Sequence, residues 1–221
     1  MSEWWTYSLS DFLMFSTRTY WRQFELMNRD LWPLPLLALG AGVLLAKAML
    51  RPTAAACRYA FLLLGVGWLW VAWAYHAERY ADINTGAPYF SAAFCVQGLM
   101  LVWVGLLRPP ASVLKTDAAP GRLAQAIVTA AIVVFPLLAP LSGRSWWQSE
   151  VFGMAPDPTC ATTLGALLLW RAPWFLWVIP LLWSAASGAT LMELHVSPAW
   201  LLPALALIAA GLRLGGSYPC K

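Results

Sequence analysis

The residues best suited to chemistry are the two histidines, His76 and His195, each of which has a glutamate two positions away. These glutamates are Glu78 and Glu193, and Asp82 follows one turn after Glu78. Imidazole and carboxylate groups together can bind a divalent transition metal, or they can accept protons near neutral pH. A third interpretation is that these side chains lie near the ends of membrane spans and reach water.

Two cofactor classes are compatible with these residues. His76, His195 and Glu193 are the candidate ligands of a divalent metal. The two histidines could also hold a haem iron from opposite sides, but the chain has no Cys-x-x-Cys-His motif, so haem is the weaker candidate. No nucleophile elbow, His-Glu-x-x-His or phosphate-binding loop is present, and no catalytic residue is predicted.

The composition indicates the environment of these residues. Of the 221 residues, 61% are hydrophobic and 11% are charged, and the mean hydropathy is +0.64. Soluble domains carry about 25% charged residues, so a water-soluble domain and a disordered chain are excluded. The net charge of +4 comes from scattered Lys and Arg rather than a basic stripe, which argues against nucleic acid as a partner. The expected partner is the lipid bilayer.

Long uncharged stretches predict an all-α, polytopic transmembrane helix bundle of about seven spans. A bilayer core is about 30 Å thick and is crossed by about 20 helical residues. Six stretches are clear candidates, namely 31–46, 59–75, 83–107, 123–143, 172–192 and 196–212. The fifth stretch in chain order, 158–170, is short, and we expect either a helix shielded by its neighbours or a re-entrant hairpin. The expected bundle covers residues 31–214, with a tail at 215–221.

The charges predict how the chain is threaded. If all seven stretches cross and the N-terminus lies outside, nine basic residues are cytoplasmic and five are outside. Asp117 is then the only cytoplasmic residue among the ten acidic ones. This agrees with the positive-inside rule, so we expect the N-terminus outside and the C-terminus in the cytoplasm. No basic residue precedes Arg18, so we expect insertion by the chain's own helices rather than by a secretory signal.

Residues 1–30 are predicted to be an interfacial amphipathic segment rather than a span. Ser16 has the character of an N-cap. One helical face after it is apolar and consists of Tyr20, Trp21, Phe24, Met27 and Leu31. Such a helix can anchor the chain in the outer interface, or it can act as a lid over an outer cavity.

Several polar residues are expected to meet near the outer face. Ionisable groups near a span end often mark a site. The candidate ligand-binding residues are His76, Glu78, Asp82, Asn84, Asp157, Thr159, Thr163, Glu193 and His195. Cys160 is expected on the same side as an accessible thiol. We therefore predict an outward-facing polar cavity that binds or transports a small solute or ion. Two alternatives stay open: an accessory subunit that contacts other membrane subunits or a second copy of itself, and an intramembrane metal or haem redox protein.

Four groups of residues also suggest a family. They are Ser10–Leu13 with Asn28-x-x-Leu-Trp-Pro, Ala74-Tyr75-His76 with Ile83-Asn84, the run from Pro158-Thr159 to Gly165, and Pro173-Trp174 with Ile179–Trp183. On these motifs the chain resembles the bacterial membrane proteins grouped as domain of unknown function 6064. The resemblance implies a compact polytopic fold in the bacterial cytoplasmic (inner) membrane and draws attention to His76 and Asn84, but it implies no reaction. The third motif of that family usually has Cys before Pro-Thr, where this chain has Asp157, so no thiol-dependent role is carried over.

Overall fold

The computed structural model describes residues 15–110 and 112–215, and every regular element within them is a helix. The α-helices are α2 (Thr17–Asp30), α3 (Leu34–Leu50), α4 (Ala54–Trp70), α5 (Ala87–Leu107), α6 (Ala119–Leu141), α7 (Pro156–Leu169), α8 (Val178–Glu193) and α9 (Leu201–Gly215). A π-helical segment, η2 (Val71–Ala77), continues α4. Short 3-10 turns are η3 (Tyr80–Asp82), η4 (Trp146–Gln148), η5 (Trp174–Leu176) and η6 (Ser197–Trp200).

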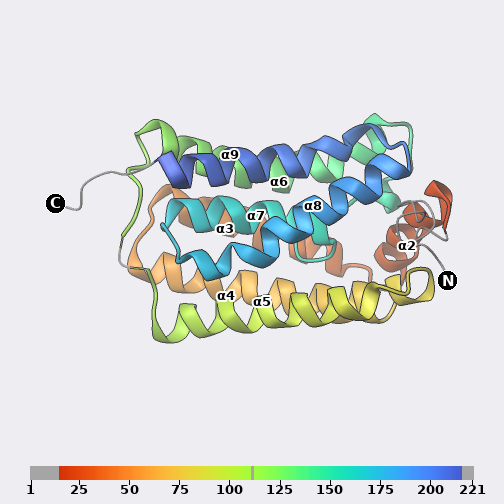
Figure 1. Cartoon of the computed structure of the whole chain (residues 1–221), viewed down its shortest axis with the longest axis horizontal. Helices are drawn as coiled ribbons and strands as arrows, with labels where there is room; N and C mark the ends of the chain where they lie inside the picture. The colour runs from red at the N-terminus through yellow and green to blue at the C-terminus, as the bar shows by residue number, and fades with distance from the viewer. Residues whose placement is uncertain (1–14, 111, 216–221) are drawn as a thin grey trace, which may run out of the picture.

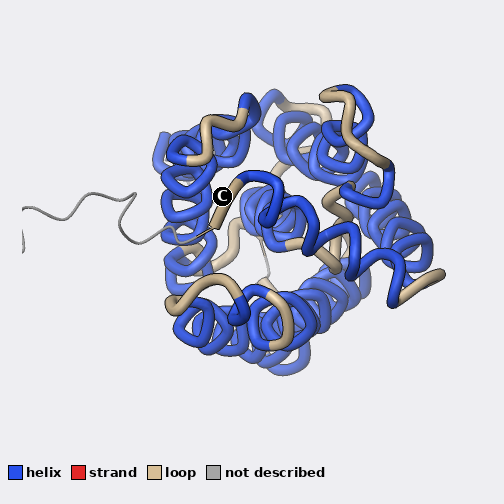
Figure 2. Tube along the Cα trace, turned by 90° about the vertical axis from the view of Figure 1, so that its right-hand side faces the viewer, coloured by secondary structure: helices blue, strands red, loops and turns tan. Residues whose placement is uncertain are grey.

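The helices from α3 to α9 run along the long axis of the molecule, whereas α2 lies across one end (Figure 1). The axes of α2 and α3 meet at 94°. Seen from the α2 end, the long helices surround the centre of the bundle and a helix crosses in front of them (Figure 2). We refer below to this end as the α2 end and to the other as the opposite end.

The predicted apolar stretches all coincide with helices of this bundle. Four helical segments are long and apolar enough to cross a membrane, namely Ala54–Asp82, Ala87–Leu107, Ala119–Leu141 and Trp174–Glu193. A fifth is added if the bent pair of α2 and α3 is treated as one span. The all-helical, membrane-compatible fold is therefore confirmed, while seven crossings stay a prediction.

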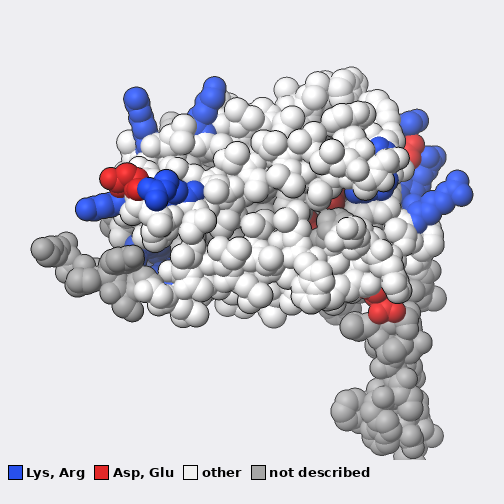
Figure 3. Space-filling model, turned by 90° about the horizontal axis from the view of Figure 1, so that it is seen from above, with Lys and Arg blue, Asp and Glu red and all other residues white. Residues whose placement is uncertain are grey.

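The surface of the bundle is apolar where lipid would contact it. Leucine and valine side chains on the outer faces of the helices are more than half exposed, among them Leu37, Leu44, Val66, Leu99, Leu182 and Leu207. Figure 3 shows Lys and Arg gathered towards the two ends of the molecule, with a broad band almost free of charge between them. A bilayer requires this distribution, because its core solvates methyl groups and not charges.

Helix α7 fills the centre of the bundle. All of its 14 residues are buried, and it lies between α4, α6, α8 and α9. A helix buried on all sides belongs to a core and not to a lipid-facing surface. The short fifth stretch is therefore a helix shielded by its neighbours, and not a re-entrant hairpin. Gly165 makes the approach to α6 possible, because a Cβ atom there would lie 2.6 Å from Val128 Cγ2 and 2.8 Å from the Ala124 carbonyl oxygen.

Prolines inside the helices leave backbone carbonyls without their usual donor, and side chains from other elements replace it. Pro140 has no N–H for the Pro136 carbonyl, which instead accepts a hydrogen bond of 2.8 Å from Ser149 Oγ. Pro180 likewise has no N–H for the Leu176 carbonyl, which accepts a hydrogen bond of 3.0 Å from Gln97 Nε2. The first of these bonds holds the segment between α6 and α7 against the bundle.

Helix α2 forms as expected, but its apolar face contacts protein. The side chain of Ser16 accepts a hydrogen bond from the Thr19 backbone N–H, which confirms the predicted N-cap. The apolar side chains on its inner face are at most 5% exposed, namely Tyr20, Trp21, Phe24 and Met27. Because these side chains pack on the bundle end, α2 covers that end instead of presenting its apolar face to lipid.

Candidate functional site

The structure divides the predicted site residues into a buried group and a surface group. His76, Asp157, Thr159 and Thr163 are at most 2% exposed. Glu78, Asp82 and His195 are exposed, and Asn84 and Glu193 are half-buried. The polar residues are therefore not lined up along one open cavity, because α2 and the segment between α6 and α7 cover the buried group.

His76 lies inside a cage of aromatic rings. The π-helical segment η2 turns this side chain inward and Glu78 outward, and insertions of this kind are frequent at functional sites. The centroid of the imidazole is 4.4 Å from that of Phe94, 5.0 Å from Tyr75 and 5.1 Å from Trp183. Neither ring nitrogen of His76 has a hydrogen-bond partner. A fully buried imidazole without a partner is costly, so this residue requires an explanation.

Asp157 lies in the first turn of α7 and accepts two hydrogen bonds. Its Oδ1 accepts from Trp183 Nε1 at 2.9 Å, and its Oδ2 accepts from Ser187 Oγ at 2.7 Å. Its position also places a negative charge at a helix N-terminus, where the helix dipole stabilises it. Trp183 therefore touches His76 with its ring and holds Asp157 with its nitrogen.

The two buried threonines use their hydroxyl groups within the fold. Thr159 Oγ1 accepts from the Gly153 N–H and donates to the Ala155 carbonyl. Thr163 Oγ1 accepts from Trp68 Nε1 at 2.7 Å and donates to the Thr159 carbonyl. Each hydroxyl donates one hydrogen bond and accepts another within the protein, so these threonines help to position α7.

Sequence reasoning missed Glu150, which precedes α7 in the segment after η4. This carboxylate is 3% exposed, and its Oε1 has no hydrogen-bond partner. Burial raises the pKa of Glu150 well above its usual range, and the negative charge of Asp157 raises it further, whereas Arg144 lowers it. A glutamate in a polar loop carries no sequence signal of burial, because the depth of the loop is set by the tertiary fold.

Tyrosines that the sequence did not single out complete the surroundings. The ring of Tyr75 lies between that of Phe24 on α2, with centroids 5.2 Å apart, and that of Tyr80, with centroids 5.4 Å apart. Both pairs are stacked. Tyr20 packs edge-on against Phe24, with centroids 5.4 Å apart. The inner face of α2 thus closes an aromatic stack over the buried polar groups.

Unpartnered buried polar atoms concentrate at the α2 end. Among the described residues, seven of the eleven such side-chain atoms belong to this end: Gln23 Nε2 and Oε1, Asn28 Oδ1, His76 Nδ1 and Nε2, Arg144 Nη1, and Glu150 Oε1. We call Gln23, Asn28, His76, Glu150 and Asp157 the covered polar cluster. Folded proteins leave few buried polar atoms unpaired, so this local excess marks a place where water, an ion or a ligand is expected.

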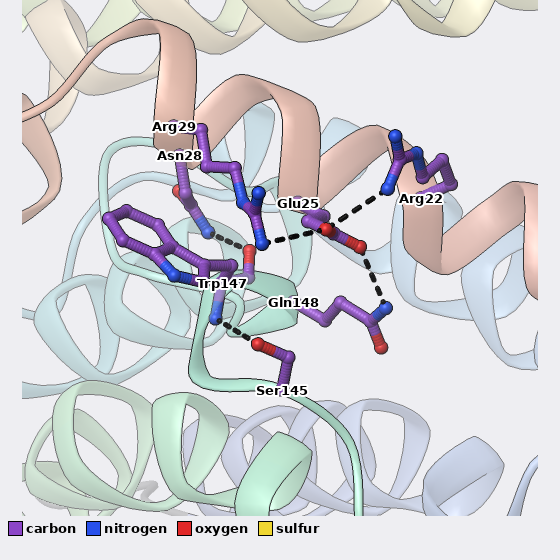
Figure 4. Close-up of polar contacts among 7 residues, drawn as sticks. All are labelled: Arg22, Glu25, Asn28, Arg29, Ser145, Trp147 and Gln148. Atoms are coloured by element: carbon purple, nitrogen blue, oxygen red, sulfur yellow. Dashed lines mark hydrogen bonds and ion pairs between the residues drawn. The ribbon is translucent and has the colours of Figure 1, made fainter.

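Helix α2 is fastened over this cluster by a polar latch, drawn in Figure 4. Glu25 Oε1 contacts Arg22 Nη1 at 3.0 Å and Arg29 Nη2 at 3.1 Å, and its Oε2 accepts from Gln148 Nε2 at 3.1 Å. The bond from Gln148 lowers the pKa of Glu25, and the charges of Arg22 and Arg29 lower it further. Asn28 Nδ2 donates to the carbonyls of Trp147 and Ser149, both at 2.9 Å. The latch joins α2 to the segment that also carries Glu150.

The surface group lines shallow pockets beside α2. Glu78 and Asp82 line a pocket of about 400 Å³ that also includes Arg22, Asp30 and Arg79. Asp82 and Asn84 line a second pocket of about 390 Å³. The Asn84 side chain accepts a hydrogen bond from the Gly86 N–H at 2.8 Å. Glu78, Asp82 and Asn84 therefore lie at the surface beside α2, and Gln23 of the covered polar cluster also lines the first of these pockets.

The candidate metal ligands are not gathered. His76 is buried, whereas His195 is exposed at a left-handed position (φ 55°) after α8. Within the described ranges, no three His, Cys, Asp or Glu side chains are grouped to hold a metal ion. Cys160 corrects a further expectation: it is fully buried, and its Sγ lies 3.2 Å from the Pro180 carbonyl oxygen, because α8 and α7 enclose it.

Comparison with known proteins gives one match. A family described as a family of unknown function (DUF6064) matches residues 17–217. No curated protein and no solved structure matches the chain. The matched range begins at α2 and ends after α9, so it includes the covered polar cluster and the latch.

Proposed function

We propose that this chain, which belongs to the DUF6064 family of unknown function, is a multi-pass membrane protein that binds or transports a small solute or ion. The binding centre is the covered polar cluster, and α2 is its lid. The protein resides in the bacterial cytoplasmic membrane, where seven helices, α3 to α9, cross the bilayer. The α2 end faces outward, and the C-terminus lies in the cytoplasm.

The charges at the two ends support this orientation. Eight described basic residues lie at the opposite end, at the ends of helices or in their connections: Lys47, Arg51, Arg58, Arg108, Lys115, Arg122, Arg171 and Arg213. Five lie at the α2 end, namely Arg18, Arg22, Arg29, Arg79 and Arg144. Basic residues are favoured on the cytoplasmic side, so the opposite end is assigned to the cytoplasm.

The observation that carries the proposal is the concentration of unpartnered polar atoms below α2. A core that served packing alone would be apolar there, because each unpaired buried polar group costs about 1–3 kcal/mol. A polar ligand or ion that pairs with these atoms recovers this cost. Binding sites in membrane bundles are commonly polar groups enclosed by helices at some depth from the surface.

The route of entry passes beside α2. The pocket lined by Glu78 and Asp82 lies between α2 and the residues that follow η2. Arg79 closes one side of it, since its Nη2 lies 3.7 Å from Asp30 Oδ2 at the end of α2. Movement of α2 about its junction with α3 would join this pocket to the covered polar cluster.

Ligand-dependent thermal stabilisation of the purified protein tests the proposal. The probes are alkali cations, ammonium, amino acids and short carboxylates, each added to protein in lipid nanodiscs. We expect at least one probe to raise the melting temperature, and His76→Phe to abolish the effect while the ring packing is kept. His195→Phe is the matched control, since that side chain is exposed, and it should respond like the wild type. If no probe stabilises the protein, or if His76→Phe retains the full response, the covered polar cluster is not the binding centre.

A further inference from the structure

We infer that Glu150 is a proton-binding site of the covered polar cluster, so that the ion handled by this protein includes the proton. This inference rests on the proposed function and names one ion for the same site. It divides the two buried carboxyl groups into different roles. Asp157 holds the negative charge, and Glu150 carries the proton.

The hydrogen bonds around the two carboxyl groups differ in kind. Asp157 receives a donor at each oxygen, Trp183 Nε1 at 2.9 Å and Ser187 Oγ at 2.7 Å, and it lies in the first turn of α7. These features all stabilise an ionised carboxylate. Glu150 Oε1 receives no donor, although the side chain is equally buried. A carboxyl group in that position is far cheaper to bury when it is protonated.

No described cation neutralises Glu150. The ion pairs of the described residues involve Glu25 with Arg22 and Arg29, and Asp30 with Arg79. Arg144 is the cation whose charge reaches Glu150, but its guanidinium is placed over the ring of Trp21, with Cζ 3.5 Å from the ring centroid. An ion pair therefore does not replace the proton.

Groups from each neighbouring element act on Glu150. Its charge interacts with Tyr20 from α2, Tyr75 from η2, Asp157 from α7, and Arg144 from the segment after α6. The phenols are neutral near pH 7, so Asp157 and Arg144 are the charged members. Burial and Asp157 raise the pKa of Glu150, and together they outweigh Arg144. The direction agrees with the missing donor at Oε1.

Latch and cluster are linked through one short segment. Gln148, which binds Glu25 on α2, lies two residues before Glu150. Asn28 on α2 binds the carbonyl of Ser149, directly before Glu150. Opening of α2 would break both bonds and bring water to the carboxyl group, where the proton could leave. Proton release and lid opening are therefore coupled by the geometry of residues 148–150.

Infrared difference spectroscopy tests the inference directly. A protonated carboxyl group has a carbonyl band that a carboxylate lacks. At pH 7, we expect the wild-type protein in nanodiscs to show this band, and Glu150→Gln to remove it. Asp157→Asn should retain the band, because that residue is assigned as ionised. Glu193→Gln, a half-buried carboxyl at the surface, is the matched control and should also retain it.

The inference is overturned if the wild type shows no protonated carboxyl at pH 7, or if the band survives in Glu150→Gln. It is also overturned if Asp157→Asn removes the band while Glu150→Gln leaves it. The carbonyl band of either variant is interpreted only if its amide bands match those of the wild type, which shows that the variant is folded. If Glu150→Gln does not fold, the band in Asp157→Asn still shows whether the protonated carboxyl group is Asp157. Absence of solute binding with the band present would reject the proposed solute site and not the proton site.

Discussion

The two halves of α7 are both fully buried, yet they are built for different purposes. The first half, at the α2 end, carries Asp157, Thr159, Cys160 and Thr163. The second half, at the opposite end, runs from Gly165 to Leu169 and packs closely on α6. One half is held by directed hydrogen bonds and the other by close contact. The same helix thus positions a polar cluster at one end and provides a rigid apolar support at the other.

Disturbing the apolar half is expected to have the largest effect. In Gly165→Val, the new side chain would overlap the Ala124 carbonyl and Val128, so α6 and α7 would have to separate. Overpacking of this kind costs about 3 kcal/mol, and we expect a large loss of folded protein and of melting temperature. Gly40→Val is the control, because a Cβ atom at Gly40 meets nothing within 4 Å. Equal behaviour of the two variants would mean that α6 and α7 do not approach as closely as described.

Removing Asp157, the hydrogen-bond acceptor in the polar half of α7, is expected to have the second largest effect on stability. Asp157→Ala leaves Trp183 Nε1 and Ser187 Oγ without an acceptor inside the bundle. Bonds to charged groups contribute about 1.5–3 kcal/mol each, so we expect a loss of about 3 kcal/mol in the free energy of unfolding. Asp117→Ala, an exposed carboxylate at the opposite end, should change it little. An unchanged free energy of unfolding in Asp157→Ala would show that the two hydrogen bonds of Asp157 do not stabilise the fold.

Glu150, which precedes the polar half of α7, should make the stability of the folded protein depend on pH. Its pKa is raised in the folded state, mainly by burial, so folding holds a proton that the unfolded chain releases above about pH 4.3. Stability therefore falls as pH rises from there to the raised pKa, by about 1.4 kcal/mol for each pH unit. Glu150→Gln does not titrate and should lack this decline. We expect its melting temperature, relative to that of the wild type, to increase as pH rises from about 4.3 towards the raised pKa, and a constant difference would contradict the assignment.

Comparing substitutions at two adjacent threonines distinguishes the contribution of a tertiary hydrogen bond from that of a local one. Thr162 and Thr163 are both fully buried, and both donate to the carbonyl four residues earlier. Only Thr163 also accepts from another helix, through Trp68 Nε1. We expect Thr163→Val to lower the free energy of unfolding by about 1–2 kcal/mol more than Thr162→Val, since the indole N–H loses its acceptor. Equal costs would mean that the link between α4 and α7 is weak.

The sequence predicted which segments form helices better than it predicted which residues are buried. Apolar stretches located the bundle helices, and Ser16 located the start of α2, because both depend on local residue pattern. The burial of Glu150 and Cys160 was not predictable in this way. For Glu150 it depends on Ser149 and Asn28, which hold the segment before α7 inside the bundle, and for Cys160 it depends on the packing of α8 on α7, so both rest on contacts between different elements.

His76 illustrates the same limit within a helix. Its place near the end of a predicted span was correct, but a regular helix would not reveal the π-helical turn that directs it into the aromatic cage. The pairing of His76 with His195 came from the predicted position of both at the outer ends of spans. The fold separates the two, since η2 buries the first and the end of α8 exposes the second.

The latch should have the smallest effect on global stability and a clear local one. Glu25→Gln weakens the contacts with Arg22 and Arg29 within α2 and the bond from Gln148, which joins α2 to the segment before α7. Hydrogen exchange within residues 17–30 should accelerate, while exchange in α6 and α7 stays unchanged. The pKa of Glu25 is lowered in the folded state, so the latch is intact above the usual glutamate range and is lost as pH falls through the lowered pKa. Unchanged exchange in residues 17–30 would show that Glu25 does not hold α2.

Labelling of Cys160 with a membrane-impermeant thiol reagent tests most directly whether α2 is the lid of an outward-facing polar site. Cys160 lies in the polar half of α7 and is fully buried, so with the other three cysteines replaced by serine it should react slowly in intact cells. Glu25→Ala should raise the rate, because it frees α2, whereas Glu193→Ala should not. A rate that is the same in all three proteins, or labelling only after the cells are opened, would contradict the assignment of α2 as an outer lid.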